Sequence, residues 1–289
     1  MRVLITGAKG QLGQSLQDTA PSGTEIIATD LHNLDLCDSA ALQTRLLDHL
    51  PEAIINTAAY TAVDKAEKEP DRAHAVNCEA VRQLAIHCAE TGCRLIHVST
   101  DFVFAGDGTQ PCRPDDPANP ASVYGQTKLA GEHALSDTDC DGRIVRTSWL
   151  YSEHGSNFVK TMIRLAAEHD RLTVVNDQTG SPTYAHNLAN VLWRLLHVWP
   201  DDRLLHYADA GETTWHAFAQ AIFSEARKLE LLATVPEVAP VTTLDYGAPA
   251  PRPAYSALDT SKLQELLEIK PPPWRSALQD MLINLSQQS

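Results

Sequence analysis

The sequence predicts an α/β protein built on a Rossmann-type, doubly wound parallel sheet, with a smaller C-terminal substrate domain partly interleaved with it. Short apolar runs alternate with helix-like stretches up to about residue 150. A glycine-rich turn follows the first run, and the alternation becomes less regular after Trp149. We therefore expect a Rossmann domain at residues 1–150 and a mainly substrate-binding domain at residues 151–289, with some later segments returning to the first sheet.

The periodicity places each element within a few residues. The expected strands of the first domain are residues 3–5, 25–29, 53–56, 94–99 and 143–147, separated by helices at 11–19, 39–50, 72–91 and 122–134. In the second domain we expect helices at 157–169, 186–197, 214–229 and 274–285, and a strand at 172–175 that returns to the first sheet. Residues 106–120 are crowded with Gly, Pro and Asp, which predicts a loop able to cover an active site.

The composition is that of an ordinary soluble protein, with 43% hydrophobic and 21% charged residues in 289. A formal net charge of -14 argues against a nucleic-acid surface, which needs a basic stripe. An anionic small ligand stays possible, because helix N-termini and a few cations can hold it locally. The sequence shows neither a secretory signal nor an apolar run long enough to span a membrane.

The six cysteines form no C-x-x-C pair, so we interpret them as reduced thiols of a cytoplasmic protein. His74 and Cys78 are four residues apart on an expected helix, which is a spacing that can bind a metal. A single such pair is much more often two partly buried helix residues, so no metal is predicted there.

The first expected strand leads directly into the turn G-A-K-G-Q-L-G, which opens a helix. Gly7 permits the tight turn, Gly10 lets the backbone approach a pyrophosphate, and Gly13 lets the helix and strand pack closely. The helix N-terminus then offers free N–H groups to the phosphates. Asp30 ends the second strand, where an acid accepts from the adenine ribose hydroxyls; the alternative is an exposed Asp in a turn.

Thr100 ends the fourth strand, and ligands of open parallel sheets bind at the carboxyl ends of the strands. Tyr124 and Lys128 are four residues apart, on one face of an expected helix. A phenol with a pKa of about 10 is a poor acid near neutrality, and a nearby ammonium lowers that pKa. A Y-x-x-x-K pair alone is often a surface pair, but its combination with the glycine turn and Thr100 predicts a catalytic set.

Reduction of a ketone needs a hydride donor, a proton donor and a hydrogen bond that holds the carbonyl oxygen. A nicotinamide supplies the hydride, Tyr124 the proton and Thr100 the hydrogen bond, while Lys128 tunes Tyr124 and holds the nicotinamide ribose.

The sequence motifs around these residues are more specific, and they are spread over most of the chain. They are N-T-A-A-Y-T-A-V-D-K-A-E from residue 56, S-T-D-F-V-F from 99, V-Y-G-Q-T-K-L-A-G-E from 123, R-T-S-W from 146, N-F-V-K-T-M from 157, V-N-D-Q-T-G-S-P-T from 175 and R-P-A-Y-S-A-L from 252. Together they resemble the dTDP-4-dehydrorhamnose reductase family of extended short-chain dehydrogenases. The resemblance implies that NADPH or NADH reduces the 4-keto group of a dTDP-sugar to give dTDP-L-rhamnose, a precursor of cell-wall polysaccharide, in a monomer or homodimer.

The resemblance also assigns residues to the two ligands. Those implied for the dinucleotide are Gly10, Gln11, Leu12, Asp30, Asp35, Leu36, Ala59, Tyr60 and Thr61, beside Gly7, Gly13, Tyr124 and Lys128. Those implied for the sugar are Val63, Thr100, Asp101, Tyr124 and Trp149, with Asn157 and Arg252 for the nucleotide diphosphate. From the residues alone, Trp149 is equally compatible with a core aromatic, Asn157 with a helix cap and Arg252 with a surface cation.

Two departures from the family pattern limit this transfer. Some members hold a metal at a dimer contact with acidic residues, and the corresponding positions here are Ser15, His186 and Asn284. We therefore predict neither a bound metal nor a metal-bridged dimer. Phe102 stands where the family often has Tyr, at a position that moves no proton.

Two alternative functions follow from the same patterns. The reductase residues do not encode the substituents of the hexose, so another nucleotide-linked ketosugar is a possible substrate. A related fold also serves as the non-catalytic regulatory subunit of methionine adenosyltransferase. The complete set of Thr100, Tyr124 and Lys128 favours an enzyme.

Overall fold

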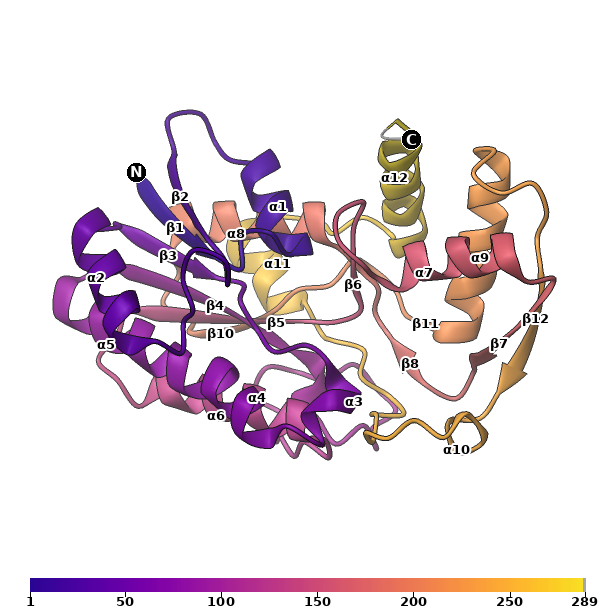
Figure 1. The fold of residues 1–289 in the computed structure, drawn as a ribbon, viewed down its shortest axis with the longest axis horizontal. Coiled ribbons are helices and arrows are strands. Elements are labelled where there is room, and N and C mark those ends of the chain that lie inside the picture. The colour runs from indigo at the N-terminus through magenta and orange to yellow at the C-terminus, as the bar shows by residue number, and fades with distance from the viewer. Residues whose placement is uncertain (288–289) are drawn as a thin grey trace.

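A six-stranded parallel sheet forms the centre of the larger lobe in the computed structural model, which describes residues 1–287 (Figure 1). Its strands lie in the order β2 (Glu25–Thr29), β1 (Arg2–Thr6), β3 (Ala53–Asn56), β4 (Arg94–Thr100), β5 (Gly142–Thr147) and β10 (Leu204–His206), and each neighbouring pair is parallel. The expected α/β class and the five expected N-terminal strands are confirmed.

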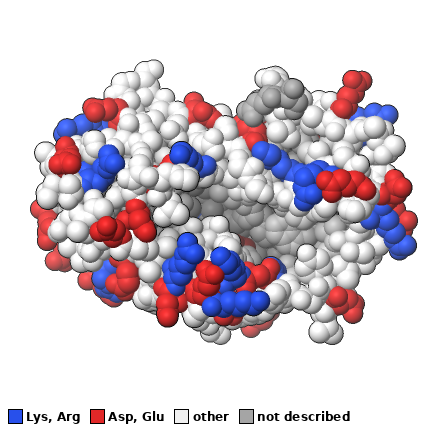
Figure 2. Space-filling model, in the orientation of Figure 1, with Lys and Arg blue, Asp and Glu red and all other residues white. Residues whose placement is uncertain are grey.

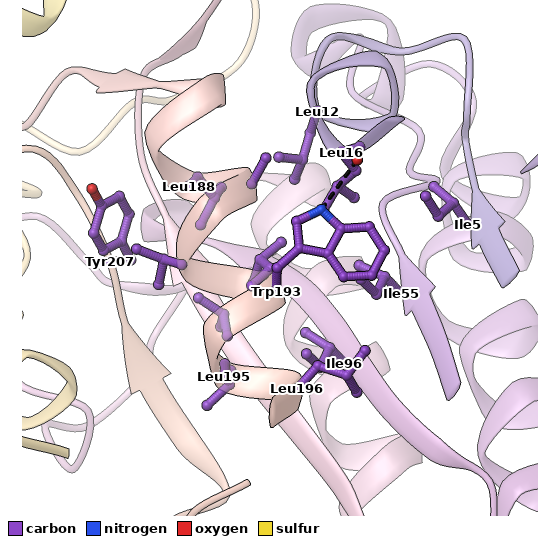
Figure 3. Packing of buried hydrophobic residues seen from close by; sticks show 14 of the residues in the cluster. Ile5, Leu12, Leu16, Ile55, Ile96, Leu188, Trp193, Leu195, Leu196 and Tyr207 are labelled. Carbon is purple, nitrogen blue, oxygen red and sulfur yellow. Dashed lines mark hydrogen bonds between the residues drawn. The ribbon is translucent and has the colours of Figure 1, made fainter. Parts of the chain in front are cut away.

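Helices cover both faces of this sheet, because successive side chains of a strand point to opposite faces. One face packs against α1 (Gln11–Asp18), α8 (Ala185–Val198) and α11 (Ser261–Leu267), and the other against α2 (Ser39–His49), α5 (Ala80–Thr91) and α6 (Val123–Ser136). On the first face Trp193 of α8 lies among the side chains of Leu12, Ile5 and Ile96, and its Nε1 donates to the Leu16 carbonyl oxygen at 3.1 Å (Figure 3).

The single helix expected at 72–91 is divided in the structure. α4 (Pro70–His74) and α5 are joined by a π-helical turn, η1 (Ala75–Glu79), and α3 (Val63–Ala66) precedes them. Asn77, in the π-helical turn, accepts from the Tyr60 backbone N–H at 2.8 Å and donates to Thr127 Oγ1 at 3.1 Å. The irregular turn thus carries contacts to α6 and to the loop after β3, which periodicity alone does not reveal.

The smaller lobe has its own apolar core, built mainly by three helices. These are α7 (Phe158–Glu168), α9 (Trp215–Lys228) and α12 (Trp274–Gln287), with the short α10 (Thr243–Tyr246) at its edge (Figure 1). Three two-stranded sheets complete it: β7 (Arg171–Val175) with β12 (Glu237–Val241), β8 (Thr179–Gly180) with β11 (Thr213–Thr214), and β6 (Leu150–Tyr151) with β9 (Thr183–Tyr184).

The strand expected to return to the first sheet was wrongly identified. Residues 172–175 lie in β7, which pairs with β12 in the smaller lobe, whereas β10 returns as the sixth strand of the central sheet. The first half of β7 is partly exposed, unlike β5 of the central sheet, which is buried throughout. Among the helices of residues 1–287, none is long and apolar enough to cross a membrane.

Candidate active site

A cleft of about 1000 Å³ lies between the lobes, at the carboxyl ends of the central strands. Figure 2 shows the molecule hollowed at this place, with basic and acidic side chains together on the rim over α3 and α4. Most of the predicted site residues line it: Gly7, Gly10, Gln11, Leu12, Asp30, Asp35, Leu36, Ala59, Tyr60, Thr61, Val63, Thr100, Asp101, Tyr124, Lys128 and Trp149. The loop at 106–120 is not among the lining residues. It packs instead on the C-terminal segment, where Cys112 N donates to the Ala257 carbonyl oxygen at 2.8 Å.

The glycine turn has the shape that a dinucleotide pyrophosphate needs. Gly7 has a φ of +65°, and a Cβ there would lie 2.9 Å from the backbone of Ala58. A Cβ on Gly13 would lie 2.3 Å from the Gly7 carbonyl oxygen, so Gly13 lets α1 pack on the turn and does not line the cleft. α1 begins after Gly10 without a side-chain cap, which leaves its first N–H groups directed at the cleft. These features fit a dinucleotide.

Asp30 lies at one end of the cleft, as expected, but it has a partner that the sequence did not indicate. Its Oδ1 accepts from the His32 backbone N–H at 2.8 Å, and Lys9 Nζ lies 3.4 Å from its Oδ2. Partial burial opposes ionisation, but these contacts prevail and lower the pKa of Asp30. The carboxylate is therefore an ionised acceptor, beside a largely exposed ammonium.

The turn after β4 brings Thr100 and Asp101 to the centre of the cleft. Thr100 Oγ1 donates to Asp101 Oδ1 at 3.1 Å and accepts from the Phe102 backbone N–H at 3.2 Å. The other carboxylate oxygen of Asp101 accepts from Ser256 Oγ at 2.6 Å. Burial raises the pKa of Asp101 to about 6, although both hydroxyls oppose this shift.

α6 places Tyr124 against this turn. Its N-cap Ser122 accepts from the Gly125 backbone N–H at 3.2 Å, and a Cβ on Gly125 would lie 2.2 Å from the Phe102 carbonyl oxygen. Glycine thus allows the helix to approach the turn, and the Tyr124 ring meets Phe102 edge to face at 5.5 Å. Burial raises the pKa of Tyr124 to about 12, while a hydrogen bond with Thr100 lowers it.

The contacts of Lys128 differ from the expectation that its ammonium lowers the pKa of Tyr124. Its amine donates to the Val98 carbonyl oxygen at 2.7 Å and lies 3.3 Å from His97 Nε2, rather than contacting the Tyr124 hydroxyl. The ammonium therefore does not lower the pKa of Tyr124 in the free protein, where burial dominates. Burial also lowers the pKa of Lys128 to about 8, against the attraction of Glu132.

Trp149 lines the cleft and also packs on the smaller lobe. It has a φ of 47°, and its ring stacks on Trp215 with centroids 3.5 Å apart and planes 7° apart. A Cβ on Gly180 would lie 2.5 Å from the indole, so this glycine leaves room for the ring. The packing expected of a core aromatic is therefore present, and the contact of Trp149 with the sugar stays a prediction.

Asn157 and Arg252 lie outside the residues that line the cleft. Asn157 caps α7, accepting from the Lys160 backbone N–H at 3.1 Å, and donates to Gln11 Oε1 at 2.9 Å, which joins the two lobes. Arg252 forms an ion pair with Asp64, the residue that follows Val63, and its Nη2 lies 2.8 Å from Oδ2 of Asp64. The helix-cap interpretation of Asn157 is confirmed, and the nucleotide contacts of both residues stay predictions.

Sequence reasoning missed several residues of the site. Arg72 and Trp215 line the cleft, and Ser256 supports Asp101 from the far end of the chain. Ser256 lies within the motif R-P-A-Y-S-A-L, whereas Arg72 and Trp215 lie outside the quoted motifs. In none of the three does the local pattern indicate a role at the site.

A small group with metal-ligand chemistry lies outside the cleft. The ligand atoms of His74, Cys78 and Glu79 are all within 4.8 Å of one another, and Glu79 is the member that the sequence did not indicate. The Nε of Arg82 lies 3.5 Å from Glu79 and competes for its carboxylate. The predicted family positions hold no such group: Ser15 donates to the Gln11 carbonyl oxygen, His186 stacks on Tyr184, and Asn284 donates to the Tyr184 hydroxyl.

The glycine turn, the parallel sheet and the cleft residues Thr100, Tyr124 and Lys128 define the class of the protein as an oxidoreductase that uses a nicotinamide dinucleotide. The chain belongs to the family described as the RmlD substrate binding domain, whose model matches residues 1–287. The predicted family resemblance is thereby confirmed.

Relatives and solved structures agree with this membership. The chain is 39% identical over 293 residues to the dTDP-4-dehydrorhamnose reductase of Salmonella typhimurium, covering 99% of this chain and 98% of the relative. It is 40% identical over 282 residues to the spore coat polysaccharide biosynthesis protein SpsK of Bacillus subtilis, covering 97% and 96%. The structure of dTDP-4-dehydrorhamnose reductase from Bacillus anthracis in complex with NADP superposes with a TM-score of 0.93 at 38% identity, covering 98% and 99%. A UDP-glucose 4-epimerase from Thermus thermophilus shares the fold, with a TM-score of 0.81 at 19% identity and coverage of 99% of each chain.

Proposed function

We propose that the protein is an NADPH-dependent dTDP-4-dehydrorhamnose reductase, which reduces the 4-keto group of dTDP-4-dehydro-6-deoxy-L-mannose to give dTDP-L-rhamnose. The observation that carries this proposal is the pair of hydroxyls, Thr100 and Tyr124, in a cleft that also contains the glycine turn. Membership in the family, with near-complete coverage of dTDP-4-dehydrorhamnose reductases, supports the substrate class.

The chain's own groups account for how the dinucleotide would be held. The N-terminus of α1, after Gly10, offers N–H groups to the pyrophosphate, and Asp30 accepts from the adenine ribose. Lys9 is paired with Asp30, and its largely exposed ammonium would meet a 2′-phosphate on leaving that carboxylate, which is consistent with NADPH without strongly excluding NADH. When bound, the dinucleotide supplies the hydride that reduces the carbonyl carbon.

The proton comes from Tyr124. Its pKa of about 12 keeps the hydroxyl protonated at neutral pH, so it can give its proton to the developing alkoxide at O4 of the sugar. Thr100 holds the same oxygen by a hydrogen bond when its single hydroxyl proton turns to that oxygen from Asp101, to which it donates in the free protein. The Lys128 ammonium, buried one helical turn from Tyr124, holds the nicotinamide ribose, and in that complex it would stabilise the phenolate that remains.

The sugar nucleotide would extend toward the smaller lobe. Val63, Asp101 and Trp149 line that part of the cleft, and Trp215 extends the aromatic surface. Asn157 and Arg252 remain our candidates for the nucleotide diphosphate, and Arg252 would have to leave Asp64 to reach it. A cytoplasmic location and a monomeric or homodimeric state are also proposed, without a metal bridge.

The decisive experiment follows NADPH absorbance with three ketosugars that differ only in the nucleotide. We expect turnover with the dTDP-ketosugar and much slower turnover with the UDP and GDP analogues. Binding of NADPH without turnover of any of them would instead favour the regulatory-subunit alternative. Preference for the UDP or GDP compound would overturn the substrate assignment while leaving the reductase chemistry in place.

A further inference from the structure

A chain of four buried polar side chains runs beneath the cleft and ends at Lys128. Thr6 Oγ1 lies 2.5 Å from Asn56 Oδ1, Asn56 Nδ2 lies 3.0 Å from His97 Nδ1, and His97 Nε2 lies 3.3 Å from Lys128 Nζ. The exposed fractions of the four residues are 0%, 1%, 0% and 1%. They come from β1, β3, β4 and α6, so the chain crosses three adjacent strands of the sheet.

The direction of the hydrogen bonds depends on the charge of Lys128. An ammonium has three donors and no acceptor, and one donor is used by the Val98 carbonyl oxygen. A second N–H of the ammonium points at His97 Nε2, so that nitrogen must carry no proton. The neutral ring then has its proton on Nδ1, from which it donates to the oxygen of the Asn56 amide. A neutral amine reverses every bond: Thr6 donates to Asn56, Asn56 to His97 Nδ1, and His97 Nε2 to the amine. The structure has the second arrangement, with Asn56 Nδ2 facing His97 Nδ1 and Asn56 Oδ1 facing Thr6, and a half-turn of the Asn56 amide gives the first.

We propose that His97 is a positioning residue for the reduction: as a neutral acceptor oriented by Asn56 and Thr6, it keeps Lys128 charged and aimed at the nicotinamide ribose and Tyr124. This inference rests on the role of Lys128 in the proposed function. His97 touches neither ligand. It acts through Lys128, which lines the cleft while His97 lies behind it.

The surroundings of Lys128 offer few other groups that could set its charge. Glu132 lies one turn further along α6, and the guanidinium of Arg146 from β5 pairs with it at 2.7 Å. Tyr124 lies one turn before Lys128, and Asp101 follows β4 on η2 (Asp101–Val103). The helices on the other side of α6 carry their Lys, Arg, Asp and Glu side chains at or near the surface, and their buried titratable groups are Cys78, His87 and Cys88. From β4, the ammonium therefore has two neutral acceptors, the Val98 carbonyl oxygen and His97, and His97 is the one whose side chain can be changed.

The test compares two amides that differ in reach by one methylene. In His97→Asn the side chain can still meet Asn56 but cannot reach Lys128, whereas in His97→Gln the amide oxygen can occupy the place of Nε2. A hydrogen bond to a charged group is worth about 1.5 to 3 kcal/mol, so its loss corresponds to a shift of roughly one pKa unit or more. We expect the alkaline limb of kcat/KM to move down by about one pH unit in His97→Asn, and to stay in place in His97→Gln. The matched control is His206→Asn, a buried histidine of β10 in the same sheet, which should leave the limb unchanged.

A second measurement needs no substitution at His97. In histidine-labelled protein, ¹⁵N NMR should show one buried ring with its proton on Nδ1 near neutral pH, moving to Nε2 as Lys128 loses its proton. This change should disappear in Lys128→Met. An alkaline limb unchanged in His97→Asn, or the absence of any ring that changes tautomer between pH 7 and 9, would overturn the inference. Near-normal kcat in Lys128→Met would instead refute the role given to Lys128 in the proposed function, which keeps the two failures distinct.

Discussion

Ser256 donates a hydrogen bond to Asp101, with its Oγ 2.6 Å from Oδ2, although 155 residues separate them in the chain. The bond favours the ionised carboxylate, which is otherwise penalised by burial. Asp101 in turn accepts from Thr100, so a serine near the C-terminus helps to orient the hydroxyl that holds the substrate carbonyl.

Ser256→Ala should therefore make the reaction more sensitive to acid. Loss of the donor raises the pKa of Asp101 above its value of about 6, by roughly one unit for a hydrogen bond to a charge. The carboxylate becomes protonated at a higher pH, so the acid limb of kcat/KM should move up by the same amount. A pH profile between 5 and 8 measures this, with Ser136→Ala, a serine at the end of α6, as the control. Superimposable acid limbs would show that Asp101 does not control the reaction in this range.

Tyr124→Phe should fold and bind the dinucleotide but lose most of its turnover. The substitution keeps the ring that packs on Phe102 and removes only the proton donor. General acid catalysis contributes a factor on the order of 10² to 10⁴, so the loss should appear in kcat with little change in KM. Steady-state kinetics, with dinucleotide binding measured by fluorescence, would test this. Near-normal kcat would refute the assigned proton donor, and an unfolded variant would show that the hydroxyl is structural.

Asp30→Ala should weaken NADH more than NADPH. The change removes an acceptor for the adenine ribose, worth roughly 0.5 to 1.5 kcal/mol, or about two- to twelvefold in KM. It also releases Lys9, whose ammonium lies 3.4 Å from Asp30 and can then meet a 2′-phosphate. KM values for both dinucleotides measure the effect, with the exposed Asp48→Ala as the control. Unchanged KM for both would show that Asp30 does not contact the ribose.

Turnover should not require an added divalent metal. The family positions that would need acidic ligands hold Ser15, His186 and Asn284, and each of these side chains has another contact. Tyr124 and Thr100 supply the proton and the hydrogen bond, so the reaction needs no Lewis acid. Activity should thus survive dialysis against a chelator. A complete loss that Mg²⁺ restores would contradict this view and direct attention to a metal site, including the group at His74, Cys78 and Glu79.

The sequence by itself determined the parallel sheet and most of the site. Short apolar strands buried on both faces and the glycine turn are local patterns, and the carboxyl ends of parallel strands must meet at one edge. The sequence alone therefore places Thr100, Tyr124 and Asp30 in one cleft. The helix cap at Asn157 is equally local, because it depends on a backbone N–H three residues away.

Only the tertiary structure decided which partners these residues have and how their charges behave. The spacing of Tyr124 and Lys128 suggested an ammonium next to the phenol, but Val98 and His97 hold the amine, and burial raises the pKa of Tyr124 to about 12. Sequence spacing also could not decide that residues 204–206, rather than 172–175, complete the central sheet. In each case the outcome depends on long-range packing, which sets desolvation and strand pairing among segments far apart in the chain and leaves no signal in a local pattern.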